Sequence, residues 1–80
     1  MINLAKNLQQ DRNINKIAVI HPTMDYHGGA EFVVDKLCEE LANLNFKVTL
    51  FTDRFDYNFF GNNKNYKIVE FNLGEYHLQI

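Results

Sequence analysis

An adjacent glycine pair, Gly28 and Gly29, separates a short apolar run from a helical pattern. The apolar run is IAVI at residues 17–20, and the helical pattern begins at Ala30. Backbone N–H groups at the start of a helix, together with the helix dipole, bind phosphate. Glycines let a phosphate approach the backbone closely because no Cβ intervenes. The same pair could instead supply only turn dihedrals or close helix–sheet packing, and the spacing alone leaves both interpretations open.

The glycine pair does not match the two best-known nucleotide-binding motifs. The stretch HGGAEF lacks the spacing of both G-x-G-x-x-G and G-x-x-x-x-G-K-[ST]. Asp53 follows the second apolar run, where a dinucleotide-binding fold holds the acid that bonds the ribose. A nucleotide- or dinucleotide-binding half of an oxidoreductase therefore remains an alternative function.

Several other polar residues lie close to the glycine pair. His21 ends the first strand and could contact a ligand, although a structural hydrogen bond is the simpler role. Asp25, Tyr26 and His27 precede the glycines and could meet an acceptor hydroxyl, or they could be solvated loop residues. Cys38 falls at the margin of the helix's apolar stripe, which predicts a packed thiol and not a nucleophile. No metal-ligand spacing is present, so no metal is expected. No catalytic acid, base or nucleophile can be assigned from the sequence.

The elements that position these residues follow from the apolar pattern. Strands are predicted at about 16–21, 47–52 and 66–71, and a helix at about 30–44, with turn signals near 61–63. Strand, helix, strand at this spacing is a βαβ unit. The sequence therefore predicts an α/β fold, a Rossmann-like βαβ with parallel strands. Residues 1–15 form a partly flexible N-terminal extension in this interpretation, and residues 16–80 form an incomplete Rossmann-like domain.

The phase of the helix can be predicted from its apolar residues. These follow the 3.6-residue period and should face the sheet, while Glu31, Asp35 and Glu39 should line a polar side. Asn45 is placed to end the helix in the left-handed conformation. The four apolar residues at 17–20 suit a strand buried on both faces, yet one helix leaves one sheet face uncovered. The expected buried stripe is Ala30, Val33, Val34, Leu37, Leu41 and Leu44.

Composition excludes several classes of protein. The chain has 80 residues, of which 46% are hydrophobic and 22% charged, so it is globular and is one domain or a piece of one. A formal net charge of -2 without a basic stripe argues against a nucleic-acid module. No apolar run approaches the ~18 residues of a membrane span, and MINLAKNLQQ is not a signal peptide. A single cysteine fits a reducing cytoplasm.

Residues 16–53 resemble the N-terminal opening of family-4-type glycosyltransferases of the GT-B fold. Those proteins begin with a buried strand, a loop ending Gly-Gly-Ala-Glu, a helix, and a second strand containing Val-Thr. The stretch TDRFD at residues 52–56 is similar to that of mannosyltransferases of the group. The matching positions are Gly28, Gly29, Ala30, Glu31, Val48, Thr49 and Thr52.

The resemblance implies the N-terminal part of a GT-B enzyme of glycan biosynthesis. Such an enzyme has two Rossmann-like domains, of which the first handles a sugar or lipid-linked acceptor and the second holds the nucleotide-sugar donor through paired glutamates. Transferred residue by residue, contact with the donor diphosphate falls on Gly28, Gly29 and the N–H of Ala30. The nucleotide sugar is a substrate, so no cofactor is implied. The protein is expected in the cytoplasm, with peripheral contact to a membrane. The resemblance also implies that the transferred sugar retains the configuration of its anomeric carbon.

The chain departs from this family at three points. Phe32 stands where the family usually has arginine, and Asn45 stands where it has a turn glycine. The donor domain is absent, so we expect the 80-residue chain alone to be inactive, and to pair with a donor domain, a partner chain or itself. A non-catalytic pairing module therefore remains a third interpretation.

Overall fold

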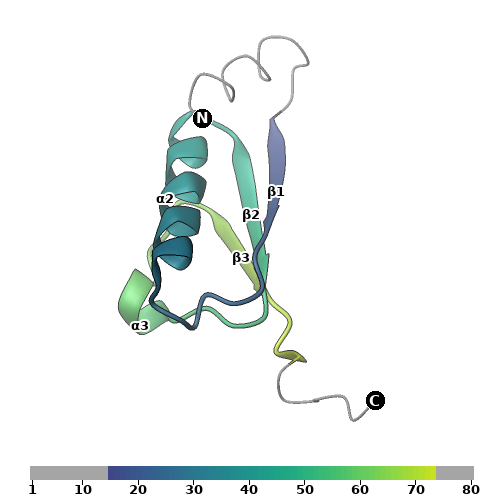
Figure 1. Cartoon of the computed structure of the whole chain (residues 1–80). Helices are drawn as coiled ribbons and strands as arrows, with labels where there is room; N and C mark the ends of the chain where they lie inside the picture. Colours follow the sequence, from purple (N-terminus) through teal and green to yellow (C-terminus); the bar gives the residue numbers. More distant parts are fainter. Residues whose placement is uncertain (1–14, 74–80) are drawn as a thin grey trace.

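The computed structural model describes residues 15–73, which form three strands and two helices (Figure 1). In chain order these are β1 (Lys16–Ile20), α2 (Gly29–Asn43), β2 (Lys47–Thr52), α3 (Tyr57–Phe60) and β3 (Lys67–Glu70). The three strands and the long helix lie within one residue of their predicted bounds, whereas the sequence did not predict α3. The predicted extension at residues 1–15 lies, apart from Asn15, outside the described residues, as do residues 74–80.

The three strands form one parallel sheet in the order β1-β2-β3. Lys16 pairs with Lys47 at the start of β1 and β2, and Thr49 of β2 pairs with Lys67 of β3. Helix α2 connects β1 to β2 and lies along one face of the sheet (Figure 1). The predicted α/β class, with a Rossmann-like βαβ arrangement, is therefore confirmed.

The core lies between α2 and the covered face of the sheet. Side chains alternate across β2, so that Val48, Leu50 and Thr52 are buried while Thr49 and Phe51 lie on the other face. The hydrophobic core comprises Met24, Cys38, Leu41, Phe46, Val48, Leu50, Phe55, Phe60 and Tyr66.

The second face of the sheet is open within the described part of the chain. On β1, Ala18 and Ile20 are exposed, and 79% of Ile20 is accessible to solvent. The expectation that this apolar strand is buried on both faces is therefore wrong for residues 15–73. The expectation that a single helix leaves one sheet face uncovered is confirmed.

The helix phase differs from the one that the apolar stripe predicts. The buried residues of α2 are Glu31, Asp35, Cys38 and Leu41. Of the other residues predicted to face the sheet, Val34, Leu37 and Leu44 are partly buried against the core, whereas Ala30 is exposed and Val33 is 56% exposed. The prediction that Glu31 and Asp35 line a polar, solvent-facing side of the helix is therefore wrong. The physical reason is that each buried carboxylate has polar partners on distant parts of the chain, and a paired charge can be buried at tolerable cost.

The end of α2 is the one that local signals predict. Asn45 has a φ of 73°, in the left-handed region. Its N–H donates to the carbonyl of Ala42 at 2.9 Å, and the N–H of Phe46 donates to the carbonyl of Leu41 at 3.2 Å. This is a Schellman motif, and it turns the buried ring of Phe46 back into the core.

Candidate functional site

The loops that follow β1 and β2 lie side by side at the carboxyl edge of the sheet. The N–H of Met24 donates to the carbonyl of Arg54 at 2.7 Å, and the N–H of Asp56 donates to the carbonyl of Met24 at 3.2 Å. Met24 is fully buried and pairs with Phe55 in an isolated parallel bridge. This pairing holds the loop that leads into the glycine pair, at the edge where open α/β folds bind their ligands.

The two glycines have different reasons to be glycine. Neither has a positive φ, so the interpretation in which they only supply turn dihedrals is wrong here. A Cβ on Gly28 would lie 2.9 Å from Oε1 of Glu31 and 2.9 Å from Cε2 of Tyr26. A Cβ on Gly29 would meet nothing within 4 Å. A Cβ at position 28 would therefore require the side chains of Glu31 and Tyr26 to shift, while nothing in the described chain requires a glycine at position 29.

The first turn of α2 presents two backbone donors to solvent. Gly28 is the N-cap and makes no side-chain capping bond. Among residues 15–73, the N–H groups of Gly29 and Ala30 have no hydrogen-bond acceptor, and both residues are exposed. These amides lie at the positive end of the helix dipole and can donate to an anion. The predicted ligand-binding residues Gly28, Gly29 and Ala30 are thus consecutive at one exposed helix end.

A part-buried hydrogen bond joins His21, at the end of β1, to Glu31 in this turn. Nε2 of His21 lies 2.8 Å from Oε2 of Glu31, and their side chains are only 19% and 11% exposed. The hydrogen bond from His21 lowers the pKa of Glu31; burial opposes this, and the N–H groups of Glu31 and Gly28 assist it. His21 therefore has the structural role expected of it, because it ties the end of β1 to the start of α2.

His27 is held by α3 and does not point freely into the loop. Its Nε2 lies 2.6 Å from Oδ2 of Asp56, and its ring stacks on Phe59 with centroids 3.9 Å apart. Asp56 is also the N-cap of α3 and accepts bonds from the N–H groups of Asn58 and Phe59. Asp56 was not among the residues predicted from the sequence, although an aspartate is a favoured N-cap residue and was the available signal.

The other two loop candidates remain at the surface. Asp25 is exposed, and its N–H donates to Oγ1 of Thr23 at 3.1 Å. Tyr26 is 68% exposed, with its ring edge against the backbone of Gly28. Asp25, Tyr26 and His27 are adjacent in the chain, but no contact joins their side chains among the described residues. Tyr26 is the one placed directly beside the glycine turn.

The residues that end β2 are used by the fold itself. The carboxylate of Asp53 accepts a hydrogen bond from the N–H of Leu73, so it anchors the chain that follows β3. Thr52 is 1% exposed, and its hydroxyl has no hydrogen-bond partner among the described residues. An acid that bonds a ribose must present its oxygens to the ligand, whereas Asp53 already uses one oxygen within the chain.

A second polar cluster, missed by the sequence analysis, is buried between α2 and the segment before β3. Oδ1 of Asp35 accepts a bond from the hydroxyl of Tyr66 at 2.6 Å and lies 2.9 Å from Nζ of Lys64. Lys64 also lies 2.7 Å from Oε2 of Glu39. The Cys38 thiol is fully buried, and burial is the main reason that its pKa is raised to about 12. The nearby negative charges of Asp35 and Glu39 raise this pKa further. This cluster is structural, and the prediction of a packed thiol is confirmed.

Residues 15–73 contain neither a cluster of metal-binding side chains nor a helix that could span a membrane. No group of three or more histidine, cysteine or acidic side chains is arranged to hold a metal ion there. No helix in that part of the chain is long and apolar enough to cross a membrane.

Comparisons of the chain with protein-family models, with curated proteins and with solved structures find no match. The function of the site is therefore inferred from its residues and its geometry.

Proposed function

We propose that this chain is the acceptor-side N-terminal segment of a glycosyltransferase, which moves a sugar from a nucleotide-sugar donor to a hydroxyl acceptor. One observation carries the proposal: Gly29 begins α2 with an exposed backbone, an N–H without an acceptor among the described residues, and open space where a Cβ would lie. The Gly-Gly-Ala-Glu stretch at residues 28–31 and the parallel βαβ unit support it.

The proposed role of the glycine turn is to stabilise the leaving group of the transfer, which is the diphosphate of the donor. Breaking the bond between the sugar and the donor leaves negative charge on the diphosphate. Preorganised N–H donors aimed at that charge stabilise the transition state. The N–H groups of Gly29 and Ala30 would each form a charge-assisted bond worth about 1.5–3 kcal/mol. A Cβ at position 29 would hold the phosphate away from these donors.

The carboxylate of Glu31 affects how strongly the glycine turn can bind phosphate. Glu31 places a carboxylate in the same helical turn, and a phosphate would be repelled by it. The imidazole of His21 lies 2.8 Å from that carboxylate and engages one of its oxygens.

Under this proposal the 80-residue chain alone transfers no sugar, because the donor nucleotide is held by a second domain. The acceptor is a sugar or a lipid-linked sugar, met in the cytoplasm or at its membrane surface. The dinucleotide-binding alternative is less well supported, because the carboxylate of Asp53 is bonded to the N–H of Leu73.

The test is a titration of the ¹⁵N-labelled chain followed by nuclear magnetic resonance. Uridine diphosphate and inorganic pyrophosphate should shift the amide signals of Gly29 and Ala30 more than any others. Uridine, which carries the same base without phosphate, is the matched ligand control and should leave them unchanged. Shifts confined to other parts of the chain would refute the phosphate role.

A variant separates binding from folding in the same experiment. Gly29→Ala should fold as the parent does, since its Cβ meets nothing within 4 Å, and should lose the diphosphate-induced shifts. Asn62→Ala, at an exposed loop position, is the control and should keep them. Equal shifts in the Gly29→Ala protein would show that the phosphate does not approach position 29.

A further inference from the structure

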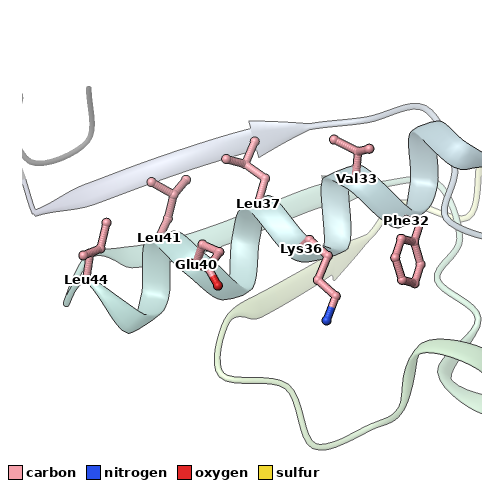
Figure 2. A pocket seen from close by; sticks show the side chains of 7 residues that line it. All are labelled: Phe32, Val33, Lys36, Leu37, Glu40, Leu41 and Leu44. Carbon is pink, nitrogen blue, oxygen red and sulfur yellow. The ribbon is translucent and has the colours of Figure 1, made fainter. Parts of the chain in front are cut away.

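The outer side of α2 carries an apolar groove of about 280 Å³, here called the α2 groove. Figure 2 shows Val33, Leu37, Leu41 and Leu44 pointing to the same side of the helix, next to the edge of β1. Phe32 and Val33 are 53% and 56% exposed, whereas Leu41 belongs to the core, so the groove runs along the border of the core. The groove is lined by Phe32, Val33, Lys36, Leu37, Glu40, Leu41 and Leu44.

The spacing of the apolar residues is that of a helix–helix contact. Positions 33, 37, 41 and 44 follow steps of four and three, which form one continuous ridge along a helix. These residues belong to the apolar stripe that the sequence predicted to be buried. Leu41 is in the core, Leu37 and Leu44 are only partly buried against it, and Val33 is exposed. The solvent-accessible part of this apolar ridge marks an interaction site.

The charges beside the ridge identify the occupant. Lys36 and Glu40 lie one helical turn apart on the same flank of the groove, as Figure 2 shows. Lys36 is 59% exposed, and its nearest acidic partner is Glu39 of its own helix at 3.5 Å. Glu40 is exposed. Both charges are therefore available to a partner that presents the opposite sequence of charges.

We infer that the α2 groove binds the α2 groove of a second copy of this chain, with the two helices antiparallel. A twofold axis brings the same surface of both copies together, and in an antiparallel pair the same flank of each helix meets. Lys36 of each copy then faces Glu40 of the other, giving two identical ion pairs. Leu37 faces Leu41, and Val33 faces Leu44, across the same axis.

The orientation is fixed by these charges. Charged residues that flank an apolar helical seam set partner choice and orientation. A parallel arrangement would place the flank that holds Lys36 and Glu40 against the opposite flank of the partner helix, so that these charges would not meet each other. The inference does not depend on the proposed function, because the groove uses none of the residues of the glycine turn.

Sedimentation equilibrium of the 80-residue chain over a wide concentration range tests this pairing. The parent should form a dimer. Lys36→Glu and Glu40→Lys should each weaken its dissociation constant at least tenfold, because each places two pairs of like charges at the interface. Lys67→Glu, an equivalent charge reversal at an exposed position of β3, is the matched control and should have no effect.

Restoration of the dimer distinguishes pairing from a folding defect. An equal mixture of the Lys36→Glu and Glu40→Lys chains should dimerise as tightly as the parent, since opposite charges then face each other at both positions. The double variant Lys36→Glu/Glu40→Lys should do the same. A chain that stays monomeric at every concentration would overturn the inference, and so would a dimer that neither single variant weakens or that the mixture fails to restore.

Discussion

Replacing Lys64 with methionine should destabilise this fold more than removing the hydroxyl of Tyr66. The ammonium of Lys64 lies 2.9 Å from Asp35 and 2.7 Å from Glu39, and it donates to the carbonyl of Phe60 at 3.0 Å. The side chains of Lys64 and Asp35 are 9% and 7% exposed. Burial alone lowers the pKa of Lys64, but the bonds to Glu39 and Asp35 outweigh it and raise the pKa. Lys64 is therefore charged at neutral pH.

The magnitude follows from what each change leaves behind. Lys64→Met leaves the buried Asp35 carboxylate without its counter-charge, and breaking a buried pair in this way costs about 3–5 kcal/mol. Glu39 is 30% exposed, and such a partly solvated pair adds at most about 1 kcal/mol. Tyr66→Phe removes one hydrogen bond to a charged group, a loss of about 1.5–3 kcal/mol. For a domain of this size, 1 kcal/mol lowers the melting temperature by about 4–8 °C.

Urea unfolding followed by circular dichroism gives the free energies of unfolding directly. Lys64→Met should lose about 2 kcal/mol more than Tyr66→Phe, by the difference of those two costs. Adding Asp35→Asn to Lys64→Met should recover part of the loss, because it removes the unpaired charge. The reasoning is refuted if Tyr66→Phe is the more costly change, or if Asp35→Asn makes the Lys64→Met chain still less stable.

Three further predictions concern groups that the fold holds in place. Cys38 should react with iodoacetamide far more slowly in the native chain than in urea at neutral pH, because burial raises its pKa to about 12; equal rates would contradict this. Asp56→Ala should lower the urea midpoint and speed hydrogen exchange in α3, since it removes the N-cap; an unchanged exchange rate would show that the cap is dispensable. The hydrogen bond with His21 lowers the pKa of Glu31 in the folded chain. The stability that ionised Glu31 contributes to the fold is therefore complete above the unfolded pKa of about 4.3, and it is lost as the pH falls through the lower folded pKa. Glu31→Gln should flatten the acid limb of a stability–pH curve, and an unaltered limb would exclude this origin.

The elements of this fold could be predicted because their signals are local. Asn45 ends α2 through its own left-handed backbone, and alternation or continuity of apolar residues marks each strand within a few positions. Helix α3 has only four residues, too few for periodicity to show, and its one signal was the N-cap Asp56.

The phase of α2 could not be predicted because its determinants are distant in the chain. Asp35 is buried by Lys64 and Tyr66, and Glu31 by His21, so partners ten or more residues away decide which face is covered. A helix phase predicted from apolar spacing alone assumes that every acidic side chain faces solvent. The same spacing did identify the apolar ridge of α2, of which Leu41 is buried and Val33 is exposed.

The candidate site was predicted in part. The glycine pair does lie at the carboxyl edge of the sheet and at the start of the helix, because strand and helix order determine that placement. The sequence could not show that the side chains of Tyr26 and Glu31 lie where a Cβ of residue 28 would meet them, whereas the space beside Gly29 is open. Nor could it show that His27 is held by Asp56 and Phe59.

Donor turnover by Gly29→Ala, in a protein that joins this chain to a donor-binding domain, tests the proposed phosphate role most directly. The kcat/KM for the nucleotide sugar should fall at least tenfold, equivalent to about 1.4 kcal/mol of lost transition-state stabilisation. The melting temperature should stay the same, because the added Cβ meets nothing within 4 Å. Turnover and melting temperature that both match the parent would show that the glycine turn does not contact the donor, and a loss of stability that parallels the loss of turnover would assign Gly29 to the fold alone.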